Sequence, residues 1–306
     1  MTDKFDSLWV VTVNWNKPEL TEACLQSILQ NGVPPSQMIL VDNGSTDDSL
    51  AYFQKHLPSI RVIASDVNLG FAGGFNLGIH HAREAGARYI FIVNNDTEVL
   101  PGTMETLYVQ AKSLNADIAA PAIYYADQPD QLWSAGGDFS SLFAAPVNAH
   151  QRNAPLPPEP IERGFLSGCA LLIQRHVFDT IGAFDEDFFL YYEDLDFMKR
   201  ADKAGFSRWL IPDAKLRHHV SASSEGALSP TVAYWMSRSS WLYFHKHAAF
   251  WQWFFILPWR LGHTLKTLLL FIFRNQWDNL LPYLSGFLMI KDKKFSPPDK
   301  PGQNNP

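Results

Sequence analysis

The chain of 306 residues is poor in cysteine and in charge. It holds two cysteines, Cys24 and Cys169, which excludes a disulfide-stabilised scaffold. Both lie in apolar stretches, so we expect two buried thiols in a protein of a reducing compartment. Charged residues make up 18% of the chain, and apolar residues make up 46%, which excludes disorder over most of its length.

Long uncharged apolar runs are also missing. No stretch reaches the ~18 residues of a membrane span. The nearest candidate, residues 248–259, is followed at once by Arg260 and soon by His263 and Lys266. The polar N-terminal residues predict no secretory signal. We therefore expect a cytoplasmic protein.

Charge is unevenly distributed along the chain. Residues 230–306 hold nine basic and three acidic residues, a formal charge of +6, so the remainder carries −12. Two parts of opposite charge predict two different tasks. The acidic part argues against a nucleic-acid partner.

The first ~120 residues alternate short apolar runs with amphipathic stretches, a rhythm typical of an α/β fold. It predicts a mainly parallel central sheet flanked by helices, and three further extended runs are expected at 166–173, 209–211 and 215–218. A helix is expected at 192–204, ended by Gly205. The earlier predicted strands are 8–13, 38–41, 60–64 and 89–93, and the earlier predicted helices are 18–30, 74–86 and one that Ser45 or Thr46 would cap and that runs to 56.

The C-terminal region has a different texture. Six of the ten tryptophans lie beyond residue 230, mixed with lysine and arginine at helical spacing. This pattern is typical of amphipathic helices in a membrane interface that is rich in anionic lipid. The alternative is a helical subdomain packed on the rest of the protein or on a second subunit of a homo-oligomer. Residues 296–306 are predicted to form a disordered tail.

Polar side chains follow four predicted strands. Asn14 follows the first strand, Asp42 the second, Asn68 the third, and Asn94-Asn95-Asp96 the fourth. Ligands of open parallel sheets bind at the carboxyl ends of the strands, so these loops predict a binding site at one edge of the sheet. The glycine-rich run after Asn68 matches neither a dinucleotide fingerprint nor a P-loop, although its N–H groups suit a phosphate.

Carboxylates and histidines add candidate chemistry. Asp96 ends an apolar strand, where an oxygen ligand suits Mg²⁺ or Mn²⁺ beside a diphosphate; a capped turn is the alternative. Glu193, Asp194 and Asp196 lie at a helix start, where mutual repulsion can raise the pKa of one into the range of a general base. Ordinary dipole partners are the alternative there. His218 and its neighbour His219 supply one possible further metal ligand.

Taken together and in order, these pieces resemble the family 2 inverting glycosyltransferases of the GT-A fold, especially the bacterial rhamnosyltransferase-like branch. The resemblance covers residues 8–225. It implies a GT-A glycosyltransferase domain at 1–225, a helical membrane-associating or interaction region at 226–295, and a tail at 296–306. The matching stretches are VVTVNWNKPELTEACLQSIL, ILVDNGSTDDS, NLGFAGGFNLGI, FIVNNDTEV, GFLSGCALLIQRHVFDTIGAFDEDFFLYYEDLDFMKRADKAGF and LRHHVSASS.

The resemblance also implies roles for single residues. Asp96 corresponds to the metal-binding carboxylate of the family's D-x-D motif, whose first aspartate is Asn94 here, which leaves fewer anionic ligands. Glu193 and Asp194 match the acidic pair, with Asp194 as the catalytic base. His218 corresponds to a histidine that reaches the metal or the diphosphate, with His219 as the alternative. The residues implied in donor binding are Val13, Asn14, Asp42, Asn68, Gly70, Gly73, Gly74, Asn76, Asn94, Asn95, Trp133 and Gly136.

The implied activity is inverting transfer of a sugar, with rhamnose favoured, from a dTDP- or UDP-linked donor to a hydroxyl of a glycan or lipid-linked acceptor. We expect it to serve cell-surface polysaccharide synthesis at the inner face of the cell membrane. A galactofuranosyl- or other hexosyltransferase of the same fold and a non-catalytic nucleotide-sugar-binding protein are the alternatives. A sugar nucleotidyltransferase is disfavoured, because residues 14–18 lack the glycine-rich basic loop of that class.

Overall fold

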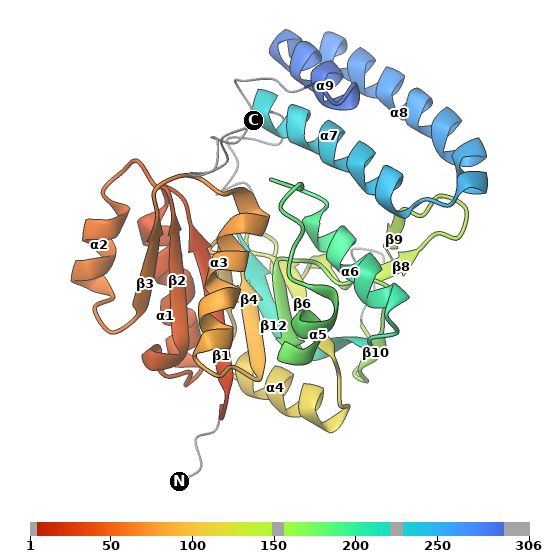
Figure 1. Cartoon of the computed structure of the whole chain (residues 1–306). Coiled ribbons are helices and arrows are strands. Elements are labelled where there is room, and N and C mark those ends of the chain that lie inside the picture. Colours follow the sequence, from red (N-terminus) through yellow and green to blue (C-terminus); the bar gives the residue numbers. More distant parts are fainter. Residues whose placement is uncertain (1–4, 149–155, 221–228, 291–306) are drawn as a thin grey trace, which may run out of the picture.

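The structure is a computed structural model that describes residues 5–148, 156–220 and 229–290 (Figure 1). A central sheet is flanked by helices, and a layer of C-terminal helices lies at one end of it, drawn in cyan and blue at the top of Figure 1. The predicted α/β class and the predicted C-terminal helices are therefore confirmed.

The central sheet has the strand order β10-β12-β6-β11-β4-β1-β2-β3. β1 is parallel to β2 and β4, β2 to β3, and β12 to β6, whereas β11 is antiparallel to both of its neighbours. The sheet is thus mainly parallel, as predicted. Its strands are β1 (Leu8–Asn14), β2 (Met38–Asn43), β3 (Arg61–Ser65), β4 (Tyr89–Val93), β6 (Ile118–Tyr125), β10 (Ile161–Glu162), β11 (Ala170–Gln174) and β12 (Arg208–His218).

Shorter strands complete the sheets. β5 (Thr97–Val99) pairs with β12, and β7 (Leu132–Ser134) pairs with β6. β8 (Gly137–Phe139) and β9 (Pro146–Asn148) form a separate two-stranded sheet. The two extended runs predicted between 209 and 218 form one strand, β12, whose register shifts between Ile211 and Lys215.

Helices cover both faces of the sheet. Val10 and Val11, neighbours in β1, belong to two different buried clusters, because successive side chains of a strand point to opposite faces. Burial on both faces explains why β4 is apolar throughout. The helices of the domain are α1 (Pro18–Gln30), α2 (Ser49–His56), α3 (Gly70–Glu84), α4 (Thr103–Ser113), α5 (Arg175–Ile181) and α6 (Glu193–Lys203), with a short 3-10 turn at Pro35–Gln37.

Two predicted helix starts are wrong. The helix that Ser45 or Thr46 was expected to cap begins at Ser49 with Asp48 as its N-cap, and the Ser45 hydroxyl instead donates to Asp42 Oδ1 at 2.6 Å. The helix expected from residue 74 begins at Gly70, so the glycine-rich run forms the first turns of α3. These glycines let α3 lie close to the sheet: a Cβ at Gly74 would be 3.0 Å from Val13 Cγ1.

Three further helices form the C-terminal layer: α7 (Pro230–His247), α8 (Trp253–Phe273) and α9 (Leu280–Phe287), with 3-10 turns at Phe250–Gln252 and Trp277–Asn279. Phe271 of α8 and Tyr283 of α9 pack together against α7. Among the described helices, none is long and apolar enough to cross a membrane. The expected tail at 296–306 and the expected domain boundary at 225–226 lie outside the described residues.

α7 is attached to the segment that leads into α6. The ring of Trp235 stacks on Phe189 with a centroid distance of 4.8 Å, and the Ser239 hydroxyl donates to Leu190 O at 2.8 Å. Phe189 in turn accepts a hydrogen bond of 2.8 Å from Phe71 N in the first turn of α3. One segment therefore connects α3, α6 and the C-terminal helices.

Candidate active site

The carboxyl ends of β1, β2 and β4 share one hydrogen-bond network. Asn14 Nδ2 donates to Asp42 Oδ1 at 2.9 Å, and Asn14 Oδ1 accepts from the Thr21 hydroxyl at 2.7 Å. Asn95 Nδ2 donates to the same hydroxyl at 2.9 Å. The polar residues predicted at three strand ends are thus brought together, and Thr21 of α1, which the sequence analysis missed, joins them.

Asn43 is a second residue that the sequence analysis missed. Its Nδ2 donates to Gly70 O at 2.9 Å and to Asn68 Oδ1 at 3.2 Å, while its Oδ1 accepts from Leu69 N at 2.9 Å. Asn43 therefore fixes the loop between β3 and α3. Its only signal in the sequence is its position next to Asp42.

The residues of α3 that were expected to bind the donor have clear structural contacts. Gly70 has φ +72°, and a Cβ there would lie 2.2 Å from Phe189 O. A Cβ at Gly73 would lie 2.7 Å from Leu69 Cβ. The amide of Asn76 bonds to both backbone groups of Phe184, donating at 2.8 Å and accepting at 3.0 Å. Their contact with a donor stays a prediction.

Asp96 and His218 face each other beside this network. Asp96, 2% exposed, lies between β4 and β5, and its Oδ1 is 3.1 Å from Nε2 of His218 at the end of β12. β5 and β12 are paired there, with His218 opposite Thr97. The edge of Trp133 in β7 packs on the His218 ring with a centroid distance of 4.5 Å. Asp96, His218 and Trp133 therefore form one cluster.

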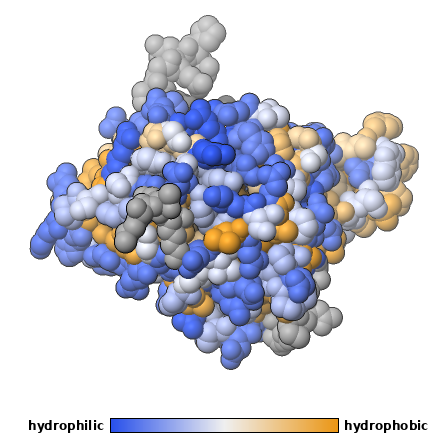
Figure 2. Space-filling model, turned by 90° about the horizontal axis from the view of Figure 1, so that it is seen from below, coloured by the Kyte–Doolittle hydropathy of each residue, from blue (hydrophilic) through white to orange (hydrophobic). Residues whose placement is uncertain are grey.

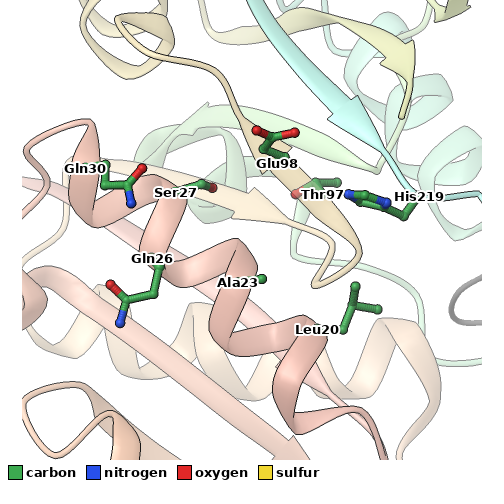
Figure 3. A pocket seen from close by; sticks show the side chains of 8 residues that line it. All are labelled: Leu20, Ala23, Gln26, Ser27, Gln30, Thr97, Glu98 and His219. Carbon is green, nitrogen blue, oxygen red and sulfur yellow. The ribbon is translucent and has the colours of Figure 1, made fainter. Parts of the chain in front are cut away.

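His219 points elsewhere. Its backbone N–H donates to Asp96 O at 2.8 Å, and its side chain lines a cavity of about 250 Å³ between α1 and β5 (Figure 3). Of the two histidines, His218 is the one whose ring reaches the Asp96 carboxylate. Gly136, predicted near the donor sugar, has φ +65° in the turn between β7 and β8, and its contact with a donor stays a prediction.

The donor set fits a divalent cation that a diphosphate helps to hold. Within the described part of the chain, no group of three or more His, Cys, Asp or Glu side chains is arranged to bind a metal. Asp96 Oδ1 and His218 Nε2 lie 3.1 Å apart, and the other ring nitrogen of His218, Nδ1, is buried with no hydrogen-bond partner among the described residues. Mg²⁺ in nucleotide sites typically takes one or two carboxylates, with phosphate oxygens and water completing its shell.

Asp194 lies in the first turn of α6 and is held by backbone N–H groups. Gly168 N donates to its Oδ2 at 2.9 Å, and Leu195 N donates to its Oδ1 at 2.7 Å. Burial raises the pKa of Asp194, and these N–H groups lower it in part. The result is a fixed carboxylate with an elevated pKa, which suits a general base.

The two neighbouring carboxylates differ from Asp194 and from each other. Glu193 is buried, and its Oε2 has no hydrogen-bond partner in the described structure. Burial first, and then the charge of Asp194, raise the pKa of Glu193 well above its ordinary value. Asp196 instead binds Arg200 and His247 at 2.8 Å and Lys246 at 2.7 Å. Asp196 therefore joins α6 to α7 and is not available as a base.

The segment before β11 connects the two acidic centres. Cys169 O accepts from Asn94 N at 2.9 Å, and the preceding Gly168 donates to Asp194. Burial, followed by the charge of Asp96, raises the pKa of the Cys169 thiol, and Asp194 contributes as well. The charges of Asp96 and Asp194 therefore both act on Cys169. Both cysteines are buried and free, as predicted.

Comparisons with known proteins agree with this arrangement. Residues 9–182 match the family described as Glycosyl transferase family 2. The chain is 28% identical over 241 residues to N-acetylglucosaminyl-diphospho-decaprenol L-rhamnosyltransferase of Mycobacterium tuberculosis, covering 72% of this chain and 78% of that protein. It is 21% identical to dTDP-rhamnosyl transferase of Shigella flexneri, and the match covers 79% of this chain and 81% of that protein. These two relatives support the rhamnosyltransferase-like branch.

Solved structures resemble the fold. A mannosyltransferase from Pyrobaculum calidifontis in complex with GDP-Man and Mn²⁺ gives a TM-score of 0.58 at 14% identity, covering 92% of this chain and 86% of that one. The crystal structure of GalNAc-T7 with UDP, GalNAc and Mn²⁺ gives a TM-score of 0.56 at 14% identity, and the match covers 69% of this chain and 43% of that one. Fold, site and family match lead to one conclusion: the chain belongs to glycosyl transferase family 2 and is a glycosyltransferase.

Proposed function

We propose that the protein transfers a sugar, with rhamnose favoured, from a nucleotide-diphosphate donor to a hydroxyl of a glycan or lipid-linked acceptor, with inversion at the anomeric carbon. The observation that carries this proposal is Asp194, a fixed carboxylate of raised pKa close to the edge where the polar strand ends meet. The two relatives named as rhamnosyltransferases support the choice of sugar.

The chemistry is a single displacement. Asp194 takes the proton of the acceptor hydroxyl, and the acceptor oxygen forms a bond to the anomeric carbon. The bond from that carbon to the diphosphate oxygen breaks on the opposite face, and the nucleoside diphosphate leaves with the electron pair. Hydrogen bonds from Gly168 and Leu195 hold both oxygens of Asp194, which fixes the direction of proton transfer.

The donor occupies the strand ends in this proposal. Asp42 and Asn14 contact the base, and the start of α3 faces the diphosphate, where a helix N-terminus favours negative charge. Asp96 and His218 would hold Mg²⁺ or Mn²⁺, which when bound stabilises charge on the leaving group. Both solved structures of similar fold contain Mn²⁺ with a nucleotide or nucleotide sugar.

In this proposal the enzyme acts at the cytoplasmic membrane surface, as a peripheral protein that is attached through its C-terminal helices. α8 turns large apolar side chains to solvent, with Phe254 80% and Phe273 82% exposed. By contrast, the end of the molecule away from these helices is largely hydrophilic (Figure 2). The exposed apolar residues of α8 include Leu257, Leu261, Leu265 and Leu269. A lipid-linked acceptor, such as the one in the name of the mycobacterial relative, lies in that interface.

Two measurements test the proposal. Thermal unfolding with dTDP- and UDP-linked sugars, with and without Mg²⁺ or Mn²⁺, selects the donor, because a ligand of the folded state raises the midpoint. Asp194→Asn is expected to abolish turnover and leave that shift intact. Turnover of Asp194→Asn near the wild-type rate would show that Asp194 is not the catalytic base. A preference for UDP-galactofuranose would select the galactofuranosyl- or other hexosyltransferase alternative. Donor binding by the wild type without any turnover would select the non-catalytic nucleotide-sugar-binding protein.

A further inference from the structure

A buried arginine lies in the C-terminal layer without a polar partner. Arg260 of α8 is 4% exposed, and it makes no hydrogen bond or ion pair with the described residues. Its Nε and Nη2 are both buried and unsatisfied. Thr264, one helical turn later and on the same face, is also buried, and its hydroxyl likewise has no partner there.

The side chains that contact Arg260 within the described part of the chain are aromatic, and no acidic side chain is among them. The guanidinium lies 5.5 Å from the ring centroid of Trp241, 5.6 Å from Phe244 and 5.9 Å from Phe287. The cation lies over the faces of these rings, and such contacts give its N–H donors no hydrogen-bond acceptor of ordinary strength. Between residues 229 and 290 the chain has one acidic residue, Asp278, and its side chain is exposed.

α8 carries two polar side chains on its buried face, beside Ile256 and Phe271, and several leucines on its exposed face. Its arginine and threonine face inward, whereas Leu261 and Leu265 face solvent. A buried charge with no counter-charge is costly, since desolvation is not repaid. Such an arrangement is expected where a ligand supplies the missing anion.

Arg260 acts electrostatically on the segment that carries the proposed base. Burial raises the pKa of the Tyr192 phenol, and the positive charge of Arg260 is the largest effect that lowers it. Tyr192 directly precedes Glu193 and Asp194, and its ring packs on Tyr243 of α7. The positive charge of Arg260 therefore acts on the residue that directly precedes the acidic pair.

We propose that Arg260, with Thr264, binds the phosphate or diphosphate group of a lipid-linked sugar acceptor. The sugar then extends toward Asp194, and the lipid chain lies along the exposed leucines of α8. Guanidinium matches phosphate oxygens with paired hydrogen bonds, and the threonine hydroxyl adds a third donor. This inference rests on the proposed function, which it extends to the chemical class of the acceptor.

The test is a binding titration of the full-length protein with farnesyl diphosphate, after the donor site has been saturated with dTDP and Mg²⁺. Farnesol and inorganic pyrophosphate are the two comparison ligands. The variants are Arg260→Met, which keeps the length and apolar contacts of the side chain, and Thr264→Val. Lys266→Met is the matched control, because Lys266 is an exposed cation on the same helix.

We expect farnesyl diphosphate to bind at least about tenfold more tightly than farnesol, the scale of a charge-assisted hydrogen bond. Arg260→Met removes that difference and Lys266→Met keeps it. Equal binding by Arg260→Met and wild type, or an equal loss in Lys266→Met, overturns the site. Pyrophosphate binding as tight as that of farnesyl diphosphate overturns the lipid-linked source.

Two controls keep the inference separate from the proposed function. If Arg260→Met does not fold, Thr264→Val supplies the decisive comparison, with an expected loss of about threefold or more. Failure of dTDP to bind the wild type rejects the donor assignment alone, since the comparison of wild type with Arg260→Met is then made with farnesyl diphosphate in the absence of dTDP. Normal dTDP binding without any response to farnesyl diphosphate rejects the Arg260 site alone.

Discussion

Gly168 and Asp194 lie in direct contact: the backbone N–H of Gly168 donates to Asp194 Oδ2 at 2.9 Å, and a Cβ at position 168 would lie 2.7 Å from Asp194 Cβ. The requirement for glycine here is one of space. A side chain at 168 either pushes the carboxylate away or breaks its hydrogen bond. The orientation of the proposed base therefore depends on a residue 26 positions earlier in the chain.

The first prediction concerns this contact. Gly168→Ala is expected to lower kcat by about 10- to 100-fold, because a small displacement of the base is costly, while the Kd for the nucleotide donor changes little. Initial rates and calorimetry measure the two quantities. Gly262→Ala is the control, since no atom lies within 4 Å of a Cβ built there. An unchanged kcat in Gly168→Ala would show that the contact does not position the base.

The sequence predicted the strand ends and the acidic pair, because both are local patterns. It did not predict Gly168, Thr21 or Asn43, whose roles come from contacts with residues distant in the chain. It also did not decide whether His218 or His219 faces the predicted metal site at Asp96. Adjacent residues near a strand end point to opposite sides, and only the pairing of β12 with β5 decides which histidine meets Asp96.

The glycine-rich run shows a second limit. Read as a loop, it predicted backbone N–H groups around a phosphate, but most of those groups lie within α3. Glycine is needed at position 74 because a Cβ there would lie only 3.0 to 3.2 Å from side-chain atoms of Val13 and Asn43. Close helix packing and phosphate binding favour the same residue type, so the sequence alone does not separate them.

The second prediction is a pH dependence of catalysis. Asp194 acts as a base only when ionised, and burial raises its pKa above the ordinary value of 3.8. As the pH is lowered, kcat is therefore expected to fall, and this fall should begin at a higher pH than it would for a base with the pKa of an ordinary aspartate. A profile of kcat from about pH 4 to pH 9 measures this acid limb. A limb at the ordinary value, or none, contradicts a base held in this environment.

The third prediction concerns Asp196 and stability. Burial alone would raise its pKa, but His247, Arg200 and Lys246 outweigh that effect and lower it. Because the pKa is lower in the folded state, the stabilisation is present above 3.8 and is lost as pH falls below that value. Asp196→Asn is expected to lower the free energy of unfolding by roughly 2–4 kcal/mol at neutral pH. This loss is smaller than that of a fully buried ion pair, because the partners of Asp196 are partly exposed.

Urea unfolding of Asp196→Asn and wild type at neutral and acidic pH measures this difference. It is expected to shrink as the pH is lowered below 3.8, the ordinary pKa of an aspartate. Asp213→Asn, at an exposed position in β12, should match the wild type throughout. A difference that does not change with pH would assign the loss to packing and not to ion pairing.

The fourth prediction tests the cation. Removing divalent metal with EDTA is expected to lower turnover by about 100-fold or more. In Asp96→Asn, Mn²⁺ should no longer increase the thermal shift given by the donor nucleotide. Glu98→Gln is the control, because the Glu98 side chain is more exposed than that of Asp96 and pairs with Arg217. A metal effect that survives in Asp96→Asn and His218→Gln would place the ion elsewhere.

The fifth prediction concerns the membrane surface. The full-length protein is expected to sediment with vesicles of phosphatidylglycerol more strongly than with phosphatidylcholine, because the C-terminal region is basic and α8 exposes apolar side chains. Leu261→Glu combined with Leu265→Glu should reduce binding at least about tenfold, since each change removes apolar contact and adds repulsion. Val109→Glu, at an exposed apolar position of α4, should have no effect. Wild-type protein that stays in the supernatant, and whose mass in solution is that of a dimer, would instead assign the apolar face of α8 to a second subunit.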